Sequence, residues 1–425
     1  MANRLRFLTL LTALALAAVA CAGPSPETGG GGGGGGGGEM VLAIGGAEAV
    51  PGGLHSQVVD LWNREHPDGP RLRLETLPDE ADQQRQQMAL ELGAQSPNFD
   101  ILGLDVIWTG EFSTNGWLEP LEDVRGQVQD VVLPGPFESA TWEGRLWAVP
   151  YNTNAGFLYY RKDLVPEAPK TWDEAVQKGM QAARQAGIAP YVGQGFQYEG
   201  MVVNYLEYFW GAGGDIFNED QSQVLYGEGD AAMRALQFMR DSQRNGFYAP
   251  GFNTMKEAEA QNEFARGNAV FMRNWPSFYT LLVDPDESQV HDKVAIAPLP
   301  TFTGEGTVSS TGGFNLAVSA FSDSKEAAKD FVVWASTNPE AQRTLAEGNL
   351  PPVMASVYEE LQDDPVMALL SEVLPDARPR PPAPEWNEIS ETMQREIHPA
   401  YNGQKDPQAA VDAIRKVLED SIQGG

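Results

Sequence analysis

Short β-rich runs alternate with helical patterns from residue 39 onward, and this alternation most limits the possible folds. Apolar residues at Leu54, Val58, Leu61 and Trp62 have helical spacing, and that pattern ends at residues 66–69. In this half of the chain we expect strands at 41–44, 71–75 and 100–104, and helices at 54–65 and 82–92. Strand–helix alternation of this kind predicts an α/β fold with a parallel sheet.

The alternation resumes beyond a crossing near Pro150. Thr171 followed by Glu174 is a capping box, which predicts a helix that runs through Ala186. Further strands are expected at 269–272, 294–297 and 314–318, and helices at 230–244, 325–336, 385–397 and 407–422. Roughly 385 residues follow the N-terminal segment, too many for one core of typical size, so two domains are expected.

The N-terminus has a secretory pattern. Arg4 and Arg6 precede a mostly apolar run, 7–20, that is too short to span a membrane. Cys21, the single cysteine, follows small residues and resembles the lipidation site of bacterial lipoproteins, although Ala18 stands where leucine is usual. We therefore expect a signal peptide over 1–20 and a lipidated Cys21. Ordinary cleavage near an incidental cysteine is the alternative.

A flexible tether is expected between Cys21 and the globular part. Residues 29–38 are ten consecutive glycines, which cannot bury enough surface to order themselves. The segment 21–38 is thus predicted to be a lipidated, glycine-rich leash, with the fold beginning near Glu39.

Composition excludes several classes of function. The formal net charge of −30 argues against nucleic acid as a partner and against binding along an anionic lipid surface. The four histidines are scattered without a metal-binding spacing, and no phosphate-binding loop or nucleophile-elbow motif is present. We expect neither a metal nor a cofactor.

Three longer motifs resemble a known family. They are residues 146–163 with 166 and 171–174, residues 105–121, and residues 267–276 with 297–300 and 312–317. Together they resemble the extracellular solute-binding proteins of ABC importers, in particular the maltose/trehalose-binding branch. Two further segments, 197–200 and 377–381, fit the trehalose-binding subgroup.

The resemblance implies a two-lobed periplasmic-binding-protein-like fold of type II, with the ligand in a cleft between lobes that hinge crossings join. Lobe 1 would comprise 40–150 and about 311–350, and lobe 2 would comprise 151–310 and about 351–425. The implied function is capture of a di- or oligosaccharide, trehalose- or maltose-like, for a membrane permease. The implied protein is a monomer without enzyme activity, outside the cytoplasm and anchored through Cys21.

The resemblance also implies ligand-binding residues. Asp105 matches a carboxylate that binds sugar hydroxyls, and it ends a strand, where open α/β sheets bind ligands. Capping of the next helix is the alternative. Asn152 and Asn154 offer donors and acceptors to hydroxyls, unless they form a turn at the hinge; relatives can have aspartate at position 154.

Trp275 matches a tryptophan that forms a sugar platform, since a flat ring covers the C–H face of a pyranose. A buried core tryptophan is the alternative. Gly313 and Phe314 match a Gly-Trp pair, and Ser277 stands where relatives can have tyrosine. These departures, with Asn154, leave the exact sugar open.

Arg380 matches an arginine that binds ligand hydroxyls, unless it is a surface guanidinium. Tyr198 and Glu199 fit the cleft, although Tyr198 fits a core position equally well. Glu48 is a further candidate, as is Arg85, whereas Trp108 is expected to pack.

Three other functions stay open on the sequence alone. A secreted glycosidase would need two carboxylates that flank a glycosidic bond, for which Asp105 and Glu199 are the candidates. A receptor for another solute, such as another oligosaccharide, a polyol, a polyamine or a peptide, fits the same fold. An adhesion or signalling protein of the cell surface is the third alternative.

Overall fold

The computed structural model describes residues 38–423, apart from 219, 220 and 382. The predicted signal peptide, Cys21 and nearly all of the glycine run therefore lie outside the described residues. No helix in the described part combines the length and the apolar character needed to cross a bilayer.

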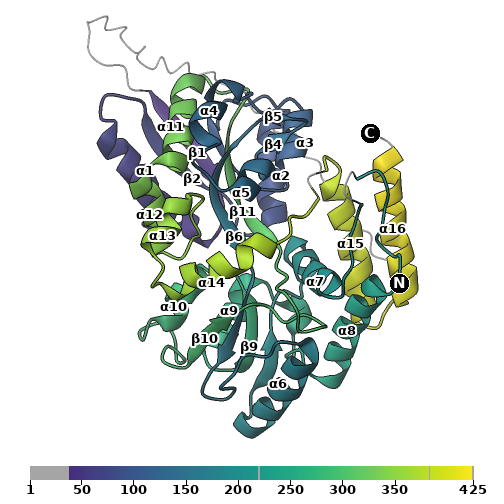
Figure 1. Cartoon of the computed structure of the whole chain (residues 1–425). Coiled ribbons are helices and arrows are strands. Elements are labelled where there is room, and N and C mark those ends of the chain that lie inside the picture. The colour runs from purple at the N-terminus through teal and green to yellow at the C-terminus, as the bar shows by residue number, and fades with distance from the viewer. Residues whose placement is uncertain (1–37, 219–220, 382, 424–425) are drawn as a thin grey trace, which may run out of the picture. The chain divides into compact units, whose positions relative to one another are not determined.

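The first sheet has five strands in the order β2-β1-β3-β11-β6. Strands β1, β2, β6 and β11 of this sheet are labelled in Figure 1. Its strands are β1 (Glu39–Ile44), β2 (Arg71–Thr76), β3 (Ile101–Asp105), β6 (Val149–Ala155) and β11 (Thr311–Val318). The first three are parallel, but β11 runs antiparallel to both β3 and β6. The expected parallel sheet is thus a mixed one, because β11 enters from the opposite end after the chain has built the second sheet.

The second sheet has four strands in the order β10-β7-β9-β8. Its strands are β7 (Phe157–Arg161), β8 (Ala189–Val192), β9 (Ala269–Asn274) and β10 (Val294–Ala297). Only β8 and β9 pair in parallel, whereas β7 is antiparallel to both of its neighbours. A two-stranded hairpin, β4 (Thr141–Trp142) with β5 (Arg145–Leu146), completes the strands of the described part.

Helices cover both sheets. With the first half of the chain are α1 (Leu54–Glu65), α2 (Ala81–Gly93), α3 (Thr109–Thr114), α4 (Arg125–Val128) and α5 (Pro134–Ser139). With the second sheet are α6 (Trp172–Ala186), α7 (Glu199–Gly211), α8 (Ala231–Asn245), α9 (Glu257–Ala265) and α10 (Phe278–Val283). The chain then forms α11 (Lys325–Thr337), α12 (Pro339–Glu347), α13 (Ala355–Glu360) and α14 (Pro365–Val373). Short 3₁₀ turns are η1 (Ala47–Ala49), η2 (Glu122–Val124), η3 (Phe252–Thr254) and η4 (Leu374–Asp376).

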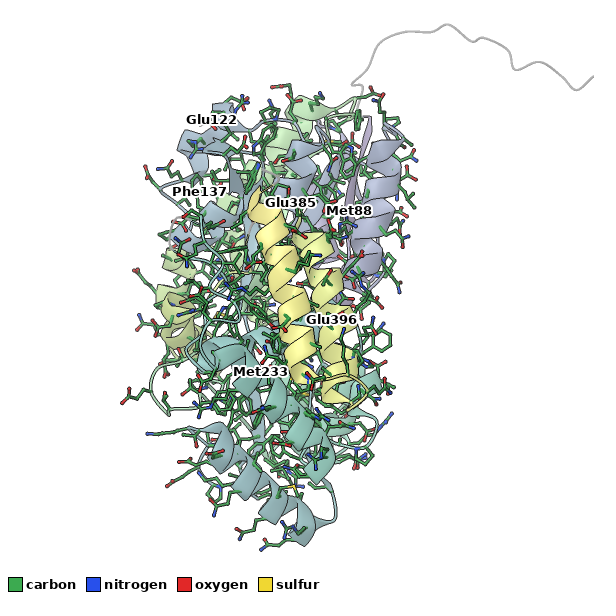
Figure 2. All side chains as sticks on the ribbon, turned by 90° about the vertical axis from the view of Figure 1, so that its right-hand side faces the viewer. Met88, Glu122, Phe137, Met233, Glu385 and Glu396 are labelled. Atoms are coloured by element: carbon green, nitrogen blue, oxygen red, sulfur yellow. The ribbon has the colours of Figure 1, made fainter. Side chains whose placement is uncertain are left out.

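The last two helices, α15 (Trp386–Tyr401) and α16 (Pro407–Gln423), lie side by side (Figure 2). Both pack against α8, and α15 also packs against α7. α15 continues four residues beyond the predicted end at Ile397 and includes Pro399. The C-terminal pair therefore extends the helical layer beside the second sheet.

Three chain crossings join the two sheets and are hydrogen-bonded to one another. The first passes through Gly156 between β6 and β7, and the second spans 298–310 between β10 and β11. The Ser309 hydroxyl donates to the Gly156 carbonyl oxygen at 2.9 Å. The third passes through Arg378, whose backbone N–H donates to Ser309 and whose carbonyl accepts from Thr311. The crossings thus form one narrow connection beside the edge where β3 ends.

Candidate functional site

A cavity of about 140 Å³ lies where the two sheets meet. Its walls include all ten residues predicted from the sequence: Glu48, Asp105, Asn152, Asn154, Tyr198, Glu199, Trp275, Gly313, Phe314 and Arg380. These residues come from segments more than 300 positions apart in the chain. The volume is room for roughly ten water molecules, which suits a small polar ligand.

Arg380 is the central cation of this cavity. Its side chain is 2% exposed, which rules out the surface alternative. One guanidinium nitrogen, Nη2, donates to Asp105 Oδ1 at 3.0 Å, and the other, Nη1, donates to Glu199 Oε1 at 2.7 Å. The guanidinium Nε is buried and has no partner in the described part of the chain. Arg380 therefore joins the end of β3 to the start of α7.

Asp105 does not cap the next helix, because the N-cap of α3 is Trp108 and no side chain bonds to that end of the helix. Its Oδ1 also accepts from the backbone N–H of Ile107 at 3.2 Å, which closes the turn after β3. Burial raises the pKa of its carboxyl group, an effect that the Arg380 charge opposes. A raised pKa reflects an incompletely compensated carboxylate, which gains from hydroxyl donors of a ligand.

Glu199 is committed to protein partners. Besides Arg380, its Oε1 accepts from Trp386 Nε1 at 3.2 Å, and its Oε2 accepts from the Ser390 hydroxyl of α15. With these bonds its lone pairs are largely used. Glu199 thus holds Arg380 in place more than it offers oxygen atoms to the cavity.

The two asparagines also have backbone partners. Asn152 Oδ1 accepts from the Phe314 N–H at 3.2 Å, and its Nδ2 donates to the Thr153 carbonyl at 3.2 Å. Asn154 Oδ1 accepts from the Ala155 N–H, while its Nδ2 has no partner among the described residues. Asn152 therefore ties β6 to β11, and Asn154 keeps a donor for the cavity.

Trp275 follows directly after β9 and is only partly buried, unlike a core tryptophan. Its carbonyl accepts from the Tyr159 hydroxyl at 2.6 Å. A Cβ added to Gly312 would lie 3.4 Å from the indole, so the ring packs against the backbone of β11. On the opposite lobe the partly buried Phe314 ring reaches toward Gly46. The cavity thus has two aromatic walls.

Tyr198 is buried, yet its hydroxyl reaches a cavity carboxylate and donates to Glu257 Oε2 at 2.6 Å. Sequence reasoning missed Glu257, Asp79 and Gln84, which also line the cavity. Asp79 follows β2 much as Asp105 ends β3, and its place after a strand end could have identified it as a ligand-binding candidate. Nothing in the sequence marked Glu257 or Gln84.

The further candidate Arg85 lies outside the cavity walls. Its guanidinium forms a two-pronged ion pair with Glu111. Trp108 is buried and stacks on Phe112, as expected for a packing residue.

The two lobes are in contact across the cavity. Lys256, at the start of α9, forms an ion pair with Glu80, at the start of α2. Burial raises the pKa of the Glu48 carboxyl, and a hydrogen bond from Ser277 on the other lobe opposes that effect. The structure is therefore a closed form.

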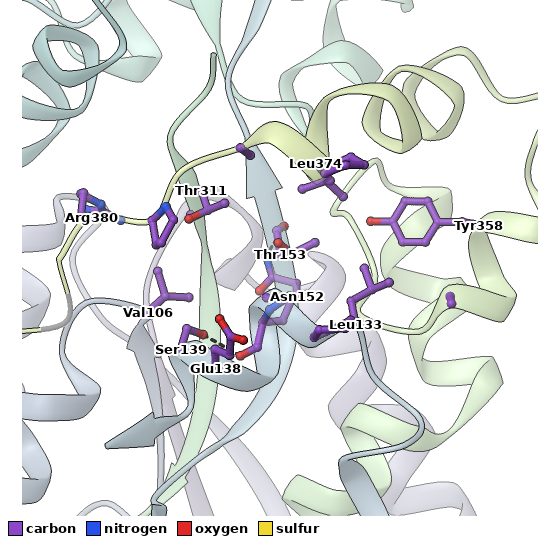
Figure 3. Close-up of a pocket in the computed structure, with 18 of the residues that line it drawn as sticks. Val106, Leu133, Glu138, Ser139, Asn152, Thr153, Thr311, Tyr358, Leu374 and Arg380 are labelled. Atoms are coloured by element: carbon purple, nitrogen blue, oxygen red, sulfur yellow. Dashed lines mark hydrogen bonds between the residues drawn. The ribbon is translucent and has the colours of Figure 1, made fainter. Parts of the chain in front are cut away.

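A second cavity, of about 590 Å³, lies beside the crossings (Figure 3). Leu133 and the following helix α5, which includes Ser139, line one wall, and α13 with η4 lines another, including Tyr358 and Leu374. Asn152 and Arg380 line both cavities. This second cavity is mostly apolar and holds none of the remaining predicted residues.

In the part of the chain that the structure describes, no three His, Cys, Asp or Glu side chains are placed to hold a metal ion together.

Known proteins share this architecture over nearly the whole chain. The solved structure of maltose-bound MalE3 of T. maritima is 33% identical and superposes with a TM-score of 0.84, covering 90% of this chain and 99% of that one. The two-lobed periplasmic-binding-protein-like fold expected from the sequence is thereby confirmed.

Curated relatives give the same picture. A probable ABC transporter-binding protein of Deinococcus radiodurans is 27% identical over 376 residues, which cover 84% of this chain and 88% of that protein. A mannitol-binding protein of Pseudomonas aeruginosa is 27% identical over 65% of this chain and 66% of its own length. The model of the bacterial extracellular solute-binding protein family matches residues 49–342. The chain therefore belongs to the family of bacterial extracellular solute-binding proteins.

Proposed function

We propose that the chain is the receptor of an ABC importer for a neutral disaccharide or short oligosaccharide of the maltose or trehalose type. The observation that supports this most is the single cavity in which Trp275, Phe314 and several carboxylates and amides converge from both lobes. Aromatic faces cover the C–H surface of a sugar ring, and carboxylates and amides accept and donate hydrogen bonds to its hydroxyls. The MalE3 structure contains maltose, which is consistent with this chemistry.

The mechanism is hinge closure around the sugar. The ligand enters an open cleft, and the lobes close about the crossings at Gly156, 298–310 and Arg378. Closure is favoured when the sugar contacts both lobes, because only differential affinity shifts the equilibrium. The closed form then docks on a membrane permease, and no bond of the sugar is broken.

Glycoside hydrolysis is a poor fit to the cavity. Asp105 and Glu199 both bind the same guanidinium of Arg380, which fills the space between them. A glycosidase needs that space for the scissile bond and, in inverting enzymes, for water. Family and relatives are binding proteins, and incubation with maltose and trehalose should release no glucose.

Titration calorimetry with maltose, trehalose and mannitol tests the proposal. We expect a dissociation constant near 1 μM, about −8 kcal/mol, for one of the disaccharides. Trp275→Ala should weaken binding at least ~10-fold by removing the platform. Trp147→Ala, at a partly exposed tryptophan that does not line the cavity, is the matched control.

Two outcomes would contradict this assignment. Binding of none of the three ligands, or equal affinity in the wild type and Trp275→Ala, would contradict the assignment of Trp275 as a sugar platform. Tight binding of mannitol alone would instead point to a polyol receptor, which the mannitol-binding relative makes the second candidate.

The proposal includes a membrane anchor at Cys21, followed by the glycine tether. A lipidated receptor samples solution while it stays near its permease. Cys21→Ser should move the protein from the membrane fraction to the soluble fraction and leave sugar affinity unchanged; retention on membranes would contradict the anchor.

A further inference from the structure

A buried cation lies directly behind the predicted sugar platform. The guanidinium carbon of Arg273, a residue of β9, is 4.0 Å from the centroid of the Trp275 ring. At this distance a guanidinium stacks on the aromatic face and is held by the ring quadrupole. The protein therefore occupies part of the indole surface, and the remainder lines the cavity.

Glu207 of α7 fixes the plane of this guanidinium through two hydrogen bonds. Arg273 Nε donates to Glu207 Oε2 at 2.9 Å, and Nη2 donates to Oε1 at 2.5 Å. The two side chains are 1% and 3% exposed. A two-pronged pair of this kind sets the orientation of the guanidinium as well as its position.

The same ion pair contacts two of the hinge crossings. Glu207 Oε1 also accepts from the backbone N–H of Ser310 at 3.2 Å, in the second crossing. In the first crossing a Cβ on Gly156 would lie 2.4 Å from Arg273 Nη2 and 2.7 Å from Glu207 Oε1. The backbone of both crossings therefore packs against the pair, and any reorientation of Arg273 would disturb them.

A buried ion pair adds little net stability compared with well-packed apolar groups. A role in positioning explains why the Arg273–Glu207 ion pair is buried behind Trp275. We propose that Arg273 is a positioning residue for sugar binding: held in plane by Glu207, it fixes the Trp275 indole in the orientation that receives the sugar and ties that orientation to the hinge. The inference rests on the proposed function, in which Trp275 is the platform.

Arg273→Lys is the primary test, because lysine keeps a positive charge opposite Glu207 and removes the flat guanidinium. The matched control is Arg161→Lys. Arg161, on β7 of the same sheet, is also nearly buried and pairs in two-pronged fashion with Asp163, at 2.8 and 2.7 Å, outside the cavity walls. Arg273→Lys should weaken sugar binding about 10-fold, and Arg161→Lys should change it less than about twofold.

A double-mutant cycle separates positioning from a general structural effect. In a Trp275→Ala background the Arg273→Lys substitution should cause no further loss of affinity, because its effect passes through the missing ring. An equal loss in both backgrounds would overturn the inference.

A measurement without sugar tests the same point. In ligand-free protein labelled with 5-fluorotryptophan, the ¹⁹F resonance of Trp275 is identified by its absence in Trp275→Phe. That resonance should shift or broaden in Arg273→Lys and stay unchanged in Arg161→Lys. An unchanged Trp275 resonance in Arg273→Lys contradicts the inference even if sugar binds to the wild type. A shifted resonance in a protein that binds no sugar supports the positioning of the ring and removes only the proposed ligand.

If Arg273→Lys does not fold, the Arg273→Gln and Glu207→Gln double variant takes its place. It removes the planar cation and leaves no unpaired buried charge. The same loss of affinity and the same resonance shift are expected, and wild-type values for both would overturn the inference.

Discussion

Position 313, in the cavity wall, requires a glycine. Gly313 has a φ of 117°, and a Cβ there would lie 2.3 Å from the Asn152 carbonyl oxygen and 2.8 Å from Thr153 Cα. Gly313→Ala should therefore lower the free energy of unfolding by about 2 kcal/mol or more, from backbone strain and displacement of β6. Because β6 carries Asn152 and Asn154, sugar affinity should fall as well; chemical denaturation and calorimetry measure the two effects.

Gly144→Ala is the matched control for this prediction. Gly144 also has a positive φ, 75°, but a Cβ there would meet no atom within 4 Å. Gly144→Ala should lower the free energy of unfolding by about 1 kcal/mol, from backbone strain alone, and should leave sugar affinity unchanged. Equal losses of stability in Gly313→Ala and Gly144→Ala would mean that the close contact with β6 adds nothing to the cost of the Gly313 substitution.

At this scale the sequence located the cavity residues but could not assign their partners. The family motifs identified ten residues that line one cavity, because several of these motifs lie where strands end in this fold. The sequence could not show that Glu199 is bound by Arg380, Trp386 and Ser390, since those residues are 181 to 191 positions away in the chain. Glu257 was missed for the same reason.

At the scale of elements, helices were predicted closely where caps mark their ends. α6 begins at Trp172 as expected, and the Thr171 hydroxyl oxygen accepts from the Glu174 N–H at 3.1 Å. The Glu174 carboxylate, however, accepts from Lys170 instead of completing the box at Thr171. Strand direction could not be predicted, because pairing of β11 with β3 and β6 depends on where the chain returns and leaves no local signal.

The cap of α6 gives a quantitative prediction. Thr171→Ala should lower the free energy of unfolding by about 1 kcal/mol, because the Glu174 N–H loses its acceptor. Ser324→Ala, at the N-cap of α11 where the side chain makes no capping bond, should be close to neutral. Denaturation of both variants checks this, and a larger loss at Ser324 than at Thr171 would contradict it. Sugar affinity should be unchanged in both.

At the scale of the whole molecule, closure brings acidic groups of the two lobes together. Asp82, in the first turn of α2, accepts from Gln394 of α15 at 3.4 Å. Burial, with the charges of Glu199 and Glu80, raises its pKa to about 7. Lobe closure therefore holds a proton that an open, hydrated cleft would release.

This arrangement predicts that sugar binding depends on pH. In the open form the pKa of Asp82 should fall toward its ordinary value near 3.8, so closure takes up a proton between about pH 4 and 7. Affinity should therefore decrease as the pH rises, by up to roughly 90-fold between pH 5 and pH 8. Asp82→Asn, which is neutral throughout, should bind more tightly than the wild type at pH 8 and show a flatter pH profile.

Calorimetry in buffers of different ionisation enthalpy measures the proton uptake directly. The wild type should take up nearly one proton at pH 6 on binding sugar, and Asp82→Asn should take up less. Asp60→Asn, at an exposed carboxylate of α1, is the control and should match the wild type. Four other carboxyl groups with raised pKa values line the same cavity and remain in every variant: Glu48, Asp79, Asp105 and Glu257. An identical pH profile in the wild type and Asp82→Asn would assign any coupling to those four groups and not to Asp82.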